Sequence, residues 1–482
     1  MAARFPHLGP PPSPNAAGRY LATLIAALLV VLGLSASPAG GSDPAVEAAA
    51  PAGRLAQPKG SAGCIHRKGT NRCAQGRAVT SPEDIAISPD GRHAYVASYG
   101  SHGIAIFRRA RRSGHLEQLP GRRGCVRHEG GEFCRAGRAM GGPVSIAVSP
   151  DGRNVYVASA GSDALSVFGR NQRTGVLTQL PGGSGCVSQR PGGGCVVGRA
   201  LNEPTSVAVS PDGAHVYVTG RRFPSGLAVF ERAADGSVTQ PAGAAGCVTH
   251  RGASECGAAR ALASPEEVTV SPDSRFVLVA AMRSSAVSVL SQRPEGLTQA
   301  EGAAGCIANG GGDEGCAAGR GLAGPVDVTV TRDGRNVYTA SSVGDAIAIL
   351  QRNRATGALS QEAGRVGCIS QGGGGGRCIR GRALDEVWSV AVSPDGRNVY
   401  GVSAKVNMLG AMARDRSTGR LSQLPGRYGC FIRGHGGLFG CAEGRGLTVA
   451  VAVTVSPGGR NVYVTSEDTY LGSVAIFRRI AG

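Results

Sequence analysis

The residues best suited to chemistry are fourteen cysteines, which fall into seven local pairs with none left over. The members of a pair stand 9 to 11 residues apart, and no histidine recurs at a fixed distance from them. Zinc sites favour C-x-x-C-like spacing, whereas one pair per repeat is typical of disulfides formed in an oxidising compartment. We therefore predict no metal and seven disulfide bonds: Cys64–Cys73, Cys125–Cys134, Cys186–Cys195, Cys247–Cys256, Cys306–Cys316, Cys368–Cys378 and Cys430–Cys441.

Two further columns of residues recur in register with the cysteines. An arginine follows the second cysteine of every pair by four residues, at Arg77, Arg138, Arg199, Arg260, Arg320, Arg382 and Arg445. Seven residues later comes a small or acidic residue, which is acidic at Asp84, Glu267 and Asp327. Guanidinium groups bind carboxylates and phosphates in a bidentate manner, so both columns are candidate ligand-binding residues. The alternative is structural, with each arginine pairing with a carboxylate or carbonyl of the neighbouring repeat.

No catalytic residue is assigned by a motif. The sequence lacks a nucleophile elbow and a phosphate-binding glycine loop, and it implies no cofactor. A hydrolase would need a general base, for which His66, Asp84, Glu267 and Asp327 are the candidates.

The columns belong to a phrase that occurs seven times, as in SPDGRNVYVAS at 149–159. First cysteines of successive repeats are 59 to 62 residues apart, and each repeat holds four short runs with strand character separated by turns. Four antiparallel strands joined by short turns make one propeller blade. We therefore predict an all-β, seven-bladed β-propeller of four-stranded blades, with both columns around the mouth of its central channel.

The two ends of the chain indicate how the ring closes. The last repeat stops after its third strand, whereas GRLAQPKGSAGC at 53–64 matches GRLSQLPGRYGC at 419–430. The N-terminal segment is thus predicted to supply a fourth strand that completes the last blade and removes an exposed sheet edge. The predicted propeller spans residues 53–482, with one cysteine-paired loop per blade.

The N-terminus is predicted to direct export. Basic residues precede a 14-residue apolar run at 21–34 and a small-residue stretch, the pattern of a signal peptide at residues 1–39. The run is short for a membrane span of about 20 residues, and an uncleaved anchor is the alternative. Residues 40–52 are predicted to be a flexible linker, and the protein is expected to be secreted or held at the cell envelope.

The stretch AVSPDGRNVYV at 147–157 resembles the repeat of the lactonase-type seven-bladed propellers. That group has YVTN repeats and includes bacterial 6-phosphogluconolactonase. The resemblance implies the same fold over residues 53–482, and its lactonase branch implies hydrolysis of sugar lactones. Members of that branch carry a histidine just before the innermost strand, and this sequence has none there.

The net charge of +18 is concentrated in the third turn of each repeat. These turns hold fourteen arginines and four acids, so we expect one face to contact an anionic envelope polymer or membrane surface. Nucleic acid is not expected, because the turns lack aromatic stacking residues. We predict a monomeric, exported scaffold for binding at the cell envelope. The alternative is a lactonase-type hydrolase that takes a small carboxylate or lactone at the channel mouth, and whether the protein is an enzyme stays open.

Overall fold

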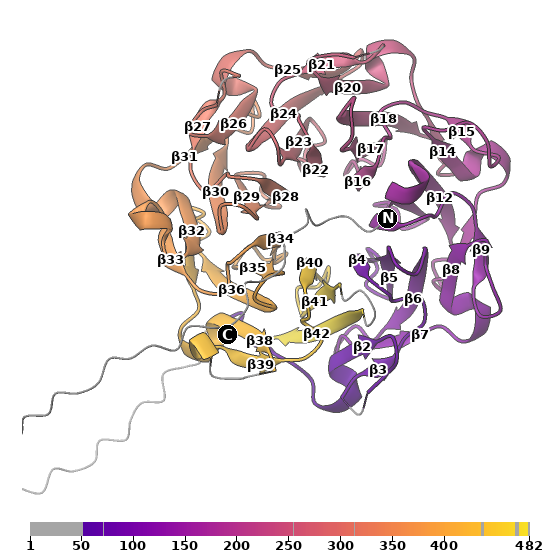
Figure 1. Cartoon of the computed structure of the whole chain (residues 1–482), viewed down its shortest axis with the longest axis horizontal. Coiled ribbons are helices and arrows are strands. Elements are labelled where there is room, and N and C mark those ends of the chain that lie inside the picture. The colour runs from indigo at the N-terminus through magenta and orange to yellow at the C-terminus, as the bar shows by residue number, and fades with distance from the viewer. Residues whose placement is uncertain are drawn as a thin grey trace, which may run out of the picture. The chain divides into compact units, whose positions relative to one another are not determined.

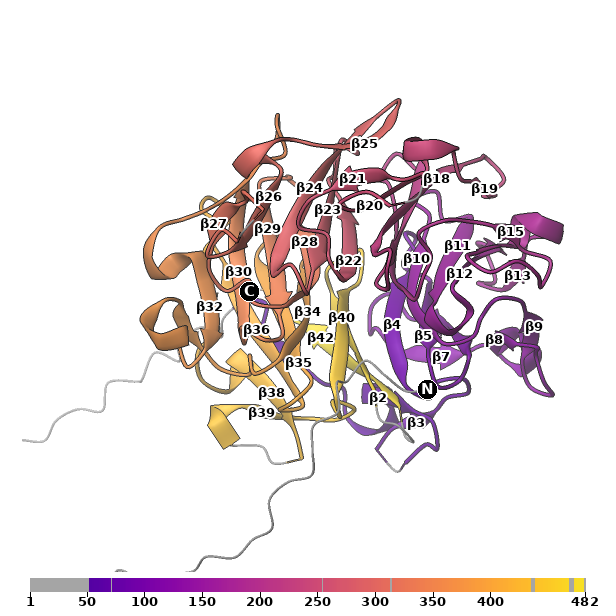
Figure 2. The same ribbon diagram turned by 45° about the horizontal axis from the view of Figure 1, so that its top comes forward.

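Seven mainly antiparallel sheets stand around a common axis, which confirms the predicted all-β, seven-bladed propeller (Figures 1 and 2). The computed structural model describes residues 52–70, 72–253, 255–312, 314–434, 438–467 and 472–480. The predicted signal peptide and residues 40–51 of the linker lie outside the described residues. Within the described part of the chain, no helix is long and apolar enough to cross a membrane.

Three long strands form the inner part of each blade. The innermost strands are β4 (Pro82–Ile87), β10 (Pro143–Val148), β16 (Pro204–Val209), β22 (Pro265–Val270), β28 (Pro325–Val330), β34 (Val387–Val392) and β40 (Ala450–Val455). The second strands are β5 (His93–Ser98), β11 (Asn154–Ser159), β17 (His215–Gly220), β23 (Phe276–Ala281), β29 (Asn336–Ser341), β35 (Asn398–Ser403) and β41 (Asn461–Ser466). The third strands are β6 (Gly103–Arg109), β12 (Ala164–Arg170), β18 (Gly226–Arg232), β24 (Ala286–Arg293), β30 (Ala346–Arg352), β36 (Met408–Arg414) and β42 (Ser473–Arg479).

The SPDG-type turns join the first strand of a blade to the second. In the second blade the Ser149 hydroxyl donates to Asp151 and accepts the N–H of Asn154, and Gly152 has a positive φ of 69°. These contacts explain why the phrase recurs, because Ser, Asp and Gly each satisfy a separate requirement of one tight turn. We call the side of the ring that carries these turns the turn face, and the opposite side, where the innermost strands begin, the start face.

The outer part of each blade differs from the prediction, because the expected fourth strand is divided. Two short strands pair with different parts of the third strand, and a third short strand follows, so each sheet has six strands. In the second blade Gln179 pairs with Phe168 and Cys186 pairs with Ser166, and a 3-10 turn over the glycine-rich residues 182–185 separates them. Proline and glycine favour a turn over a continuous strand, which explains the interruption.

The short outer strands repeat in all seven blades. The first of them are β7 (Leu116–Gln118), β13 (Leu177–Gln179), β19 (Val238–Thr239), β25 (Gly296–Gln299), β31 (Leu359–Gln361), β37 (Leu421–Gln423) and β1 (Leu55–Ala56). The second are β8 (Cys125–His128), β14 (Cys186–Ser188), β20 (Cys247–His250), β26 (Cys306–Asn309), β32 (Cys368–Gln371), β38 (Cys430–Arg433) and β2 (Cys64–His66). The last are β9 (Arg135–Gly137), β15 (Val196–Val197), β21 (Gly257–Ala259), β27 (Ala317–Gly319), β33 (Ile379–Gly381), β39 (Ala442–Gly444) and β3 (Ala74–Gln75).

Ten 3-10 turns complete the elements that the described residues form. Seven precede the first cysteine of a pair: η1 (Gly60–Gly63), η2 (Gly121–Gly124), η4 (Gly182–Gly185), η5 (Gly243–Ala245), η6 (Gly302–Ala304), η7 (Gly364–Gly367) and η9 (Gly426–Gly429). The others are η3 (Ala160–Ser162), η8 (Gly374–Gly376) and η10 (Leu438–Gly440).

All seven predicted disulfides are present, each within its own repeat. The Cα atoms of each bonded pair are 4.8 or 4.9 Å apart, inside the range that a disulfide needs. Each bond spans the connection between two outer strands that pair in parallel, such as β14 and β15. A parallel pair normally needs a long crossover connection, so the disulfide stabilises a pairing that the short connecting loop alone would constrain weakly.

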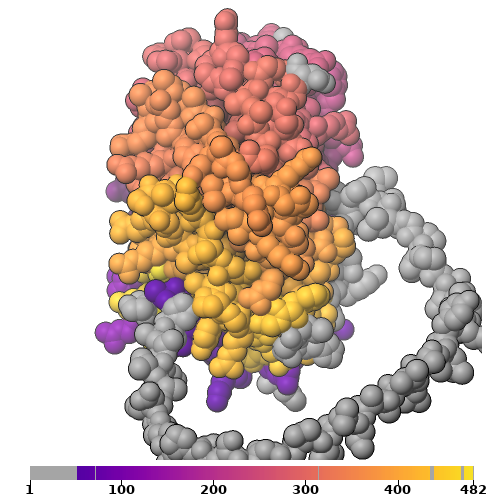
Figure 3. Space-filling view, turned by 90° about the vertical axis from the view of Figure 1, so that its left-hand side faces the viewer, coloured from indigo at the N-terminus to yellow at the C-terminus, as the bar shows by residue number. Residues whose placement is uncertain are grey.

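The N-terminal segment completes the seventh blade, as the sequence predicts. Leu55 of β1 pairs with Arg479 of β42, and Cys64 of β2 pairs with Ala475 of the same strand. The segment contributes three short strands rather than one, because it contains the whole divided outer edge. In the space-filling view, indigo atoms of the N-terminal segment lie against the yellow C-terminal repeat (Figure 3).

Candidate functional site

The seven arginines that follow the cysteines lie at the outer strands, where they join neighbouring blades. The guanidinium of Arg77 donates to the backbone carbonyls of Leu119 and Gly121 in the next blade, both at 3.0 Å. Its backbone N–H donates to Oε1 of Gln118 at 2.8 Å, and Nε2 of Gln118 donates back to the Arg77 carbonyl at 2.9 Å. We call this reciprocal pair the Arg–Gln clasp.

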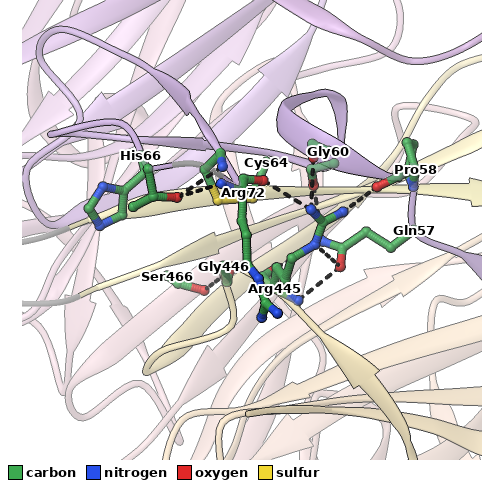
Figure 4. The surroundings of a disulfide bond; sticks show 12 residues. Gln57, Pro58, Gly60, Cys64, His66, Arg72, Arg445, Gly446 and Ser466 are labelled. Atoms are coloured by element: carbon green, nitrogen blue, oxygen red, sulfur yellow. Dashed lines mark hydrogen bonds between the residues drawn. A yellow bond between two sulfur atoms is a disulfide. The ribbon is translucent and has the colours of Figure 1, made fainter. Parts of the chain in front are cut away.

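The clasp recurs at every junction between blades. The other pairs are Arg138–Gln179, Arg199–Gln240, Arg260–Gln299, Arg320–Gln361, Arg382–Gln423 and Arg445–Gln57. The last of them closes the ring, and there Arg445 also donates to the carbonyls of Pro58, Gly60 and Arg72 (Figure 4). These contacts match the structural alternative, in which each arginine binds carbonyls of the neighbouring repeat. The arginines lie at the outer strands, away from the innermost strands and thus not around the mouth of the channel as predicted.

The acidic column lies on the innermost strands, where it forms hydrogen bonds between blades. Oδ2 of Asp84 accepts the N–H of Ile146 in the next blade at 2.9 Å, and Oδ2 of Asp327 accepts the N–H of Val390 at 2.8 Å. Glu267 instead accepts from the hydroxyl of Ser206 at 2.8 Å. The column therefore holds the central edges of the blades together, which is a structural role.

One carboxyl in this column is chemically distinct. Burial raises the pKa of Asp327 to about 6, against hydrogen bonds from Ser389 and the Val390 N–H, and the charge of Asp84 adds to the increase. Asp84 and Asp327 are thus close enough to interact, although they belong to the first and fifth blades. His66, the remaining predicted candidate for a base, belongs to β2 on the outer edge of the seventh blade and is not near them.

The third-turn arginines do not all face solvent. Six of them end the third strands and contact the preceding blade in the ring: Arg109, Arg170, Arg232, Arg352, Arg414 and Arg479. Arg109, for example, is only 5% exposed and donates to Tyr463 and Asn461 of the seventh blade. The run FRRARR at 107–112 therefore presents three arginines to solvent rather than four.

A polar cluster that the sequence analysis missed lies on the start face. Arg221 forms ion pairs with Glu203 and with Glu266, and its Nη1 is 3.8 Å from Oε2 of Glu266. Burial, followed by the charges of Glu203 and Glu83, raises the pKa of Tyr99 in the first blade. We call Tyr99, Glu203, Arg221 and Glu266 the start-face cluster.

A signal for this cluster exists in the repeat. The residue after the second strand is small in three blades, but it varies widely across all seven: Tyr99, Ala160, Arg221, Met282, Ser342, Ala404 and Glu467. In a regular repeat, such an irregular column is where function departs from symmetry. Among the described residues, no group of three or more His, Cys, Asp and Glu side chains is placed to hold a metal ion.

The fold and the cysteine-paired outer edges define a class, that of disulfide-bonded seven-bladed propellers. A protein-family model described as "Lactonase, 7-bladed beta-propeller" matches residues 63–197, which confirms the resemblance predicted from the repeats.

Solved structures share the architecture at low sequence identity. Hydrazine synthase from Kuenenia stuttgartiensis is 15% identical with a TM-score of 0.51, over 84% of this chain and 98% of that one. A periplasmic gluconolactonase from Pseudomonas aeruginosa is 18% identical with a TM-score of 0.47, over 71% of this chain and 84% of that one. The comparison with curated proteins finds no match. At 15% identity, the match to hydrazine synthase shows likeness in fold alone.

Proposed function

We propose that the protein is an exported scaffold that binds an anionic polymer of the cell envelope on its turn face. The observation that carries the proposal is a groove of about 500 Å³ between the first and second blades. Its lining includes Asp90, Asp151, Arg92 and Arg173. Arg170 also lines the groove, so three arginines face two acids there.

Each of the two acids of the groove already forms an ion pair with an arginine that ends a third strand. Asp90 pairs with Arg170 at 3.0 Å, and Asp151 pairs with Arg232 at 2.7 Å. Arg92 and Arg173 are exposed, so the charge offered to a ligand is positive. Guanidinium groups in such positions bind phosphate or carboxylate groups along a chain.

Export and location at the envelope are part of the same proposal. Seven intramolecular disulfides and no free cysteine among the described residues indicate folding in an oxidising environment. The basic stretch and apolar run at the N-terminus support secretion.

Titration of the purified protein with a poly(glycerol phosphate) chain tests the proposal. Binding should weaken as salt rises from about 0.1 to 1 M, because the Debye length falls from about 10 to 3 Å. The double variant Arg92→Ser/Arg173→Ser should weaken binding by about tenfold, the equivalent of about 1.4 kcal/mol. The control Arg123→Ser/Arg433→Ser removes two exposed charges elsewhere and should bind as the wild type does. Equal loss in both variants would show that only net charge matters and would refute the groove.

A second candidate function is lactone hydrolysis on the start face, favoured by the contact of Arg221 with Glu266. In that reaction the Glu266 carboxylate would take a proton from water as the water attacks the lactone carbonyl, and Arg221 would stabilise the resulting oxyanion. The match to the lactonase family model over residues 63–197 supports lactone hydrolysis as an activity, and the contact in the third and fourth blades supports its location. Glu266 is 6% exposed, so its environment is dry enough to strengthen such interactions.

Ring opening of glucono-1,5-lactone, followed in a pH-stat, separates the two functions. A general base contributes about 10²–10⁴-fold, so hydrolysis by the wild type should fall by that factor in Glu266→Gln. Glu255→Gln, an exposed carboxylate of an outer loop, is the matched control. Hydrolysis no faster than in buffer eliminates the second candidate and leaves polymer binding unaffected.

A further inference from the structure

The turn-face end of the central channel carries one exception to the repeat. Six of the seven first turns have proline after the initial serine: Pro89, Pro150, Pro211, Pro272, Pro394 and Pro457. In the fifth blade the corresponding residue is Arg332. Proline fits this position because its φ is fixed at the value that a turn requires. An arginine there lacks this preset φ and so favours the turn less.

Arg332 lies against a cavity. The cavity has a volume of about 410 Å³ and is lined by residues of the first, fifth, sixth and seventh blades. Its walls include Pro89, Pro394 and Pro457 from the turns and Thr329 from β28. The volume is within the range of pockets that hold small organic ligands.

The guanidinium of Arg332 is the single charge in the lining of this cavity. It is exposed, and within the described part of the chain it forms no hydrogen bond or ion pair. This distinguishes it from Arg352 in the same blade, whose buried guanidinium pairs with Asp273. Most of the other lining residues are prolines and valines.

We infer that this cavity binds a small organic monocarboxylate with a compact apolar body. A guanidinium presents two parallel N–H donors that match a carboxylate, and the attraction is stronger beside apolar walls than in open water. Proline and valine side chains would cover the apolar part of the ligand. The inference is independent of the proposed polymer binding, because the charged residues differ and the ligand has one charge, although Pro89 borders both the cavity and the groove.

Isothermal titration of the full protein with benzoate tests the inference, with benzamide as the uncharged analogue of the same shape. Benzoate should bind and benzamide should not, because only the carboxylate can pair with Arg332. Arg332→Pro restores the residue of the other six blades and should weaken benzoate binding at least tenfold. Arg335→Ala removes an exposed charge from the same turn outside the cavity and should leave binding unchanged.

The outcomes separate this inference from the proposed function. Arg332→Pro should keep wild-type affinity for poly(glycerol phosphate), whereas Arg92→Ser/Arg173→Ser should keep wild-type affinity for benzoate. If Arg332→Pro does not fold, Arg332→Gln tests the same charge. The inference is overturned if benzoate does not bind at about 10 mM, which is tenfold above a Kd of about 1 mM, or about −4.1 kcal/mol. It is also overturned if benzamide binds as well as benzoate, or if loss of the Arg332 charge has no effect.

Discussion

Replacement of Arg170 by alanine should destabilise the propeller more than any change of an exposed arginine. Its side chain is 1% exposed and fills a space between the first and second blades. Nε donates to the Tyr95 hydroxyl and Nη1 to the Gly152 carbonyl, both at 2.7 Å. Nη2 contacts Asp90 at 3.0 Å and Nδ1 of His93 at 2.8 Å. The alanine variant would leave these groups without their partner.

The expected loss is about 3–5 kcal/mol in the free energy of unfolding, because the variant removes a buried guanidinium and leaves the buried Tyr95 hydroxyl and Gly152 carbonyl without their donor. That is a large share of the roughly 5–15 kcal/mol that stabilises a typical domain. Urea unfolding at pH 7 measures it, with Arg173→Ala as the control. Arg173 is exposed three residues further along, and its replacement should change stability by at most about 0.5 kcal/mol. A loss below 1 kcal/mol for Arg170→Ala would contradict the packing described here.

The difference in the free energy of unfolding between the wild type and Arg170→Ala should become smaller as the pH falls. Burial and Arg170 lower the pKa of His93 from 6.5 to about 4. Burial opposes the shift of Asp90, but Ser88, the Arg92 N–H and Arg170 lower its pKa from 3.8 to about 2. In the folded state both groups bind fewer protons than in the unfolded state. Their contributions to stability are therefore fully present above the unfolded pKa values and are lost as the pH falls through the folded values. A constant difference from pH 7 to pH 3 would show that Arg170 does not interact with them.

Three other perturbations have definite outcomes. The pKa of Asp327 rises from 3.8 to about 6 on folding, so wild-type stability should fall as the pH rises through that range. In the wild type this loss is at most about 3 kcal/mol in the free energy of unfolding between pH 4 and pH 7. Asp327→Asn should remove it, and urea unfolding at the two pH values measures the change. The double variant Cys186→Ala/Cys195→Ala should lose about 2–3 kcal/mol, and peptide mapping without reduction should still find the other six bonds. Leu55→Ala, at a residue 3% exposed in the closing segment, should lose about 2–5 kcal/mol, and an unchanged melting temperature would refute closure through β1.

Blade number, disulfides and ring closure could be predicted because each depends on residue columns that repeat at a fixed distance. The division of the fourth strand was not predicted, because short strands of two to four residues carry little periodicity. The LPGGSG stretch at 180–185 was the available signal. The Arg–Gln clasp was missed for a different reason. Gln118 and Arg77 are 41 residues apart, and nothing local links them.

The candidate sites show a similar limit. FRRARR at 107–112 reads as an exposed basic run, yet Arg109 ends a strand and points between blades. Whether an arginine on a strand end is buried depends on the neighbouring blade, which the local sequence does not describe. The start-face cluster follows an irregular column, and that column becomes visible only when the seven repeats are aligned on the second strand.

Hydrogen–deuterium exchange of the protein with and without poly(glycerol phosphate) tests the central claim most directly. If the polymer lies in the turn-face groove, protection should appear in residues 89–92, 151–153 and 170–173, which border it. At a polymer concentration near the wild-type Kd, the same segments should be clearly less protected in Arg92→Ser/Arg173→Ser, whose affinity is expected to be about tenfold lower. Protection confined to the start face, or no change in exchange at saturating polymer, would contradict the account.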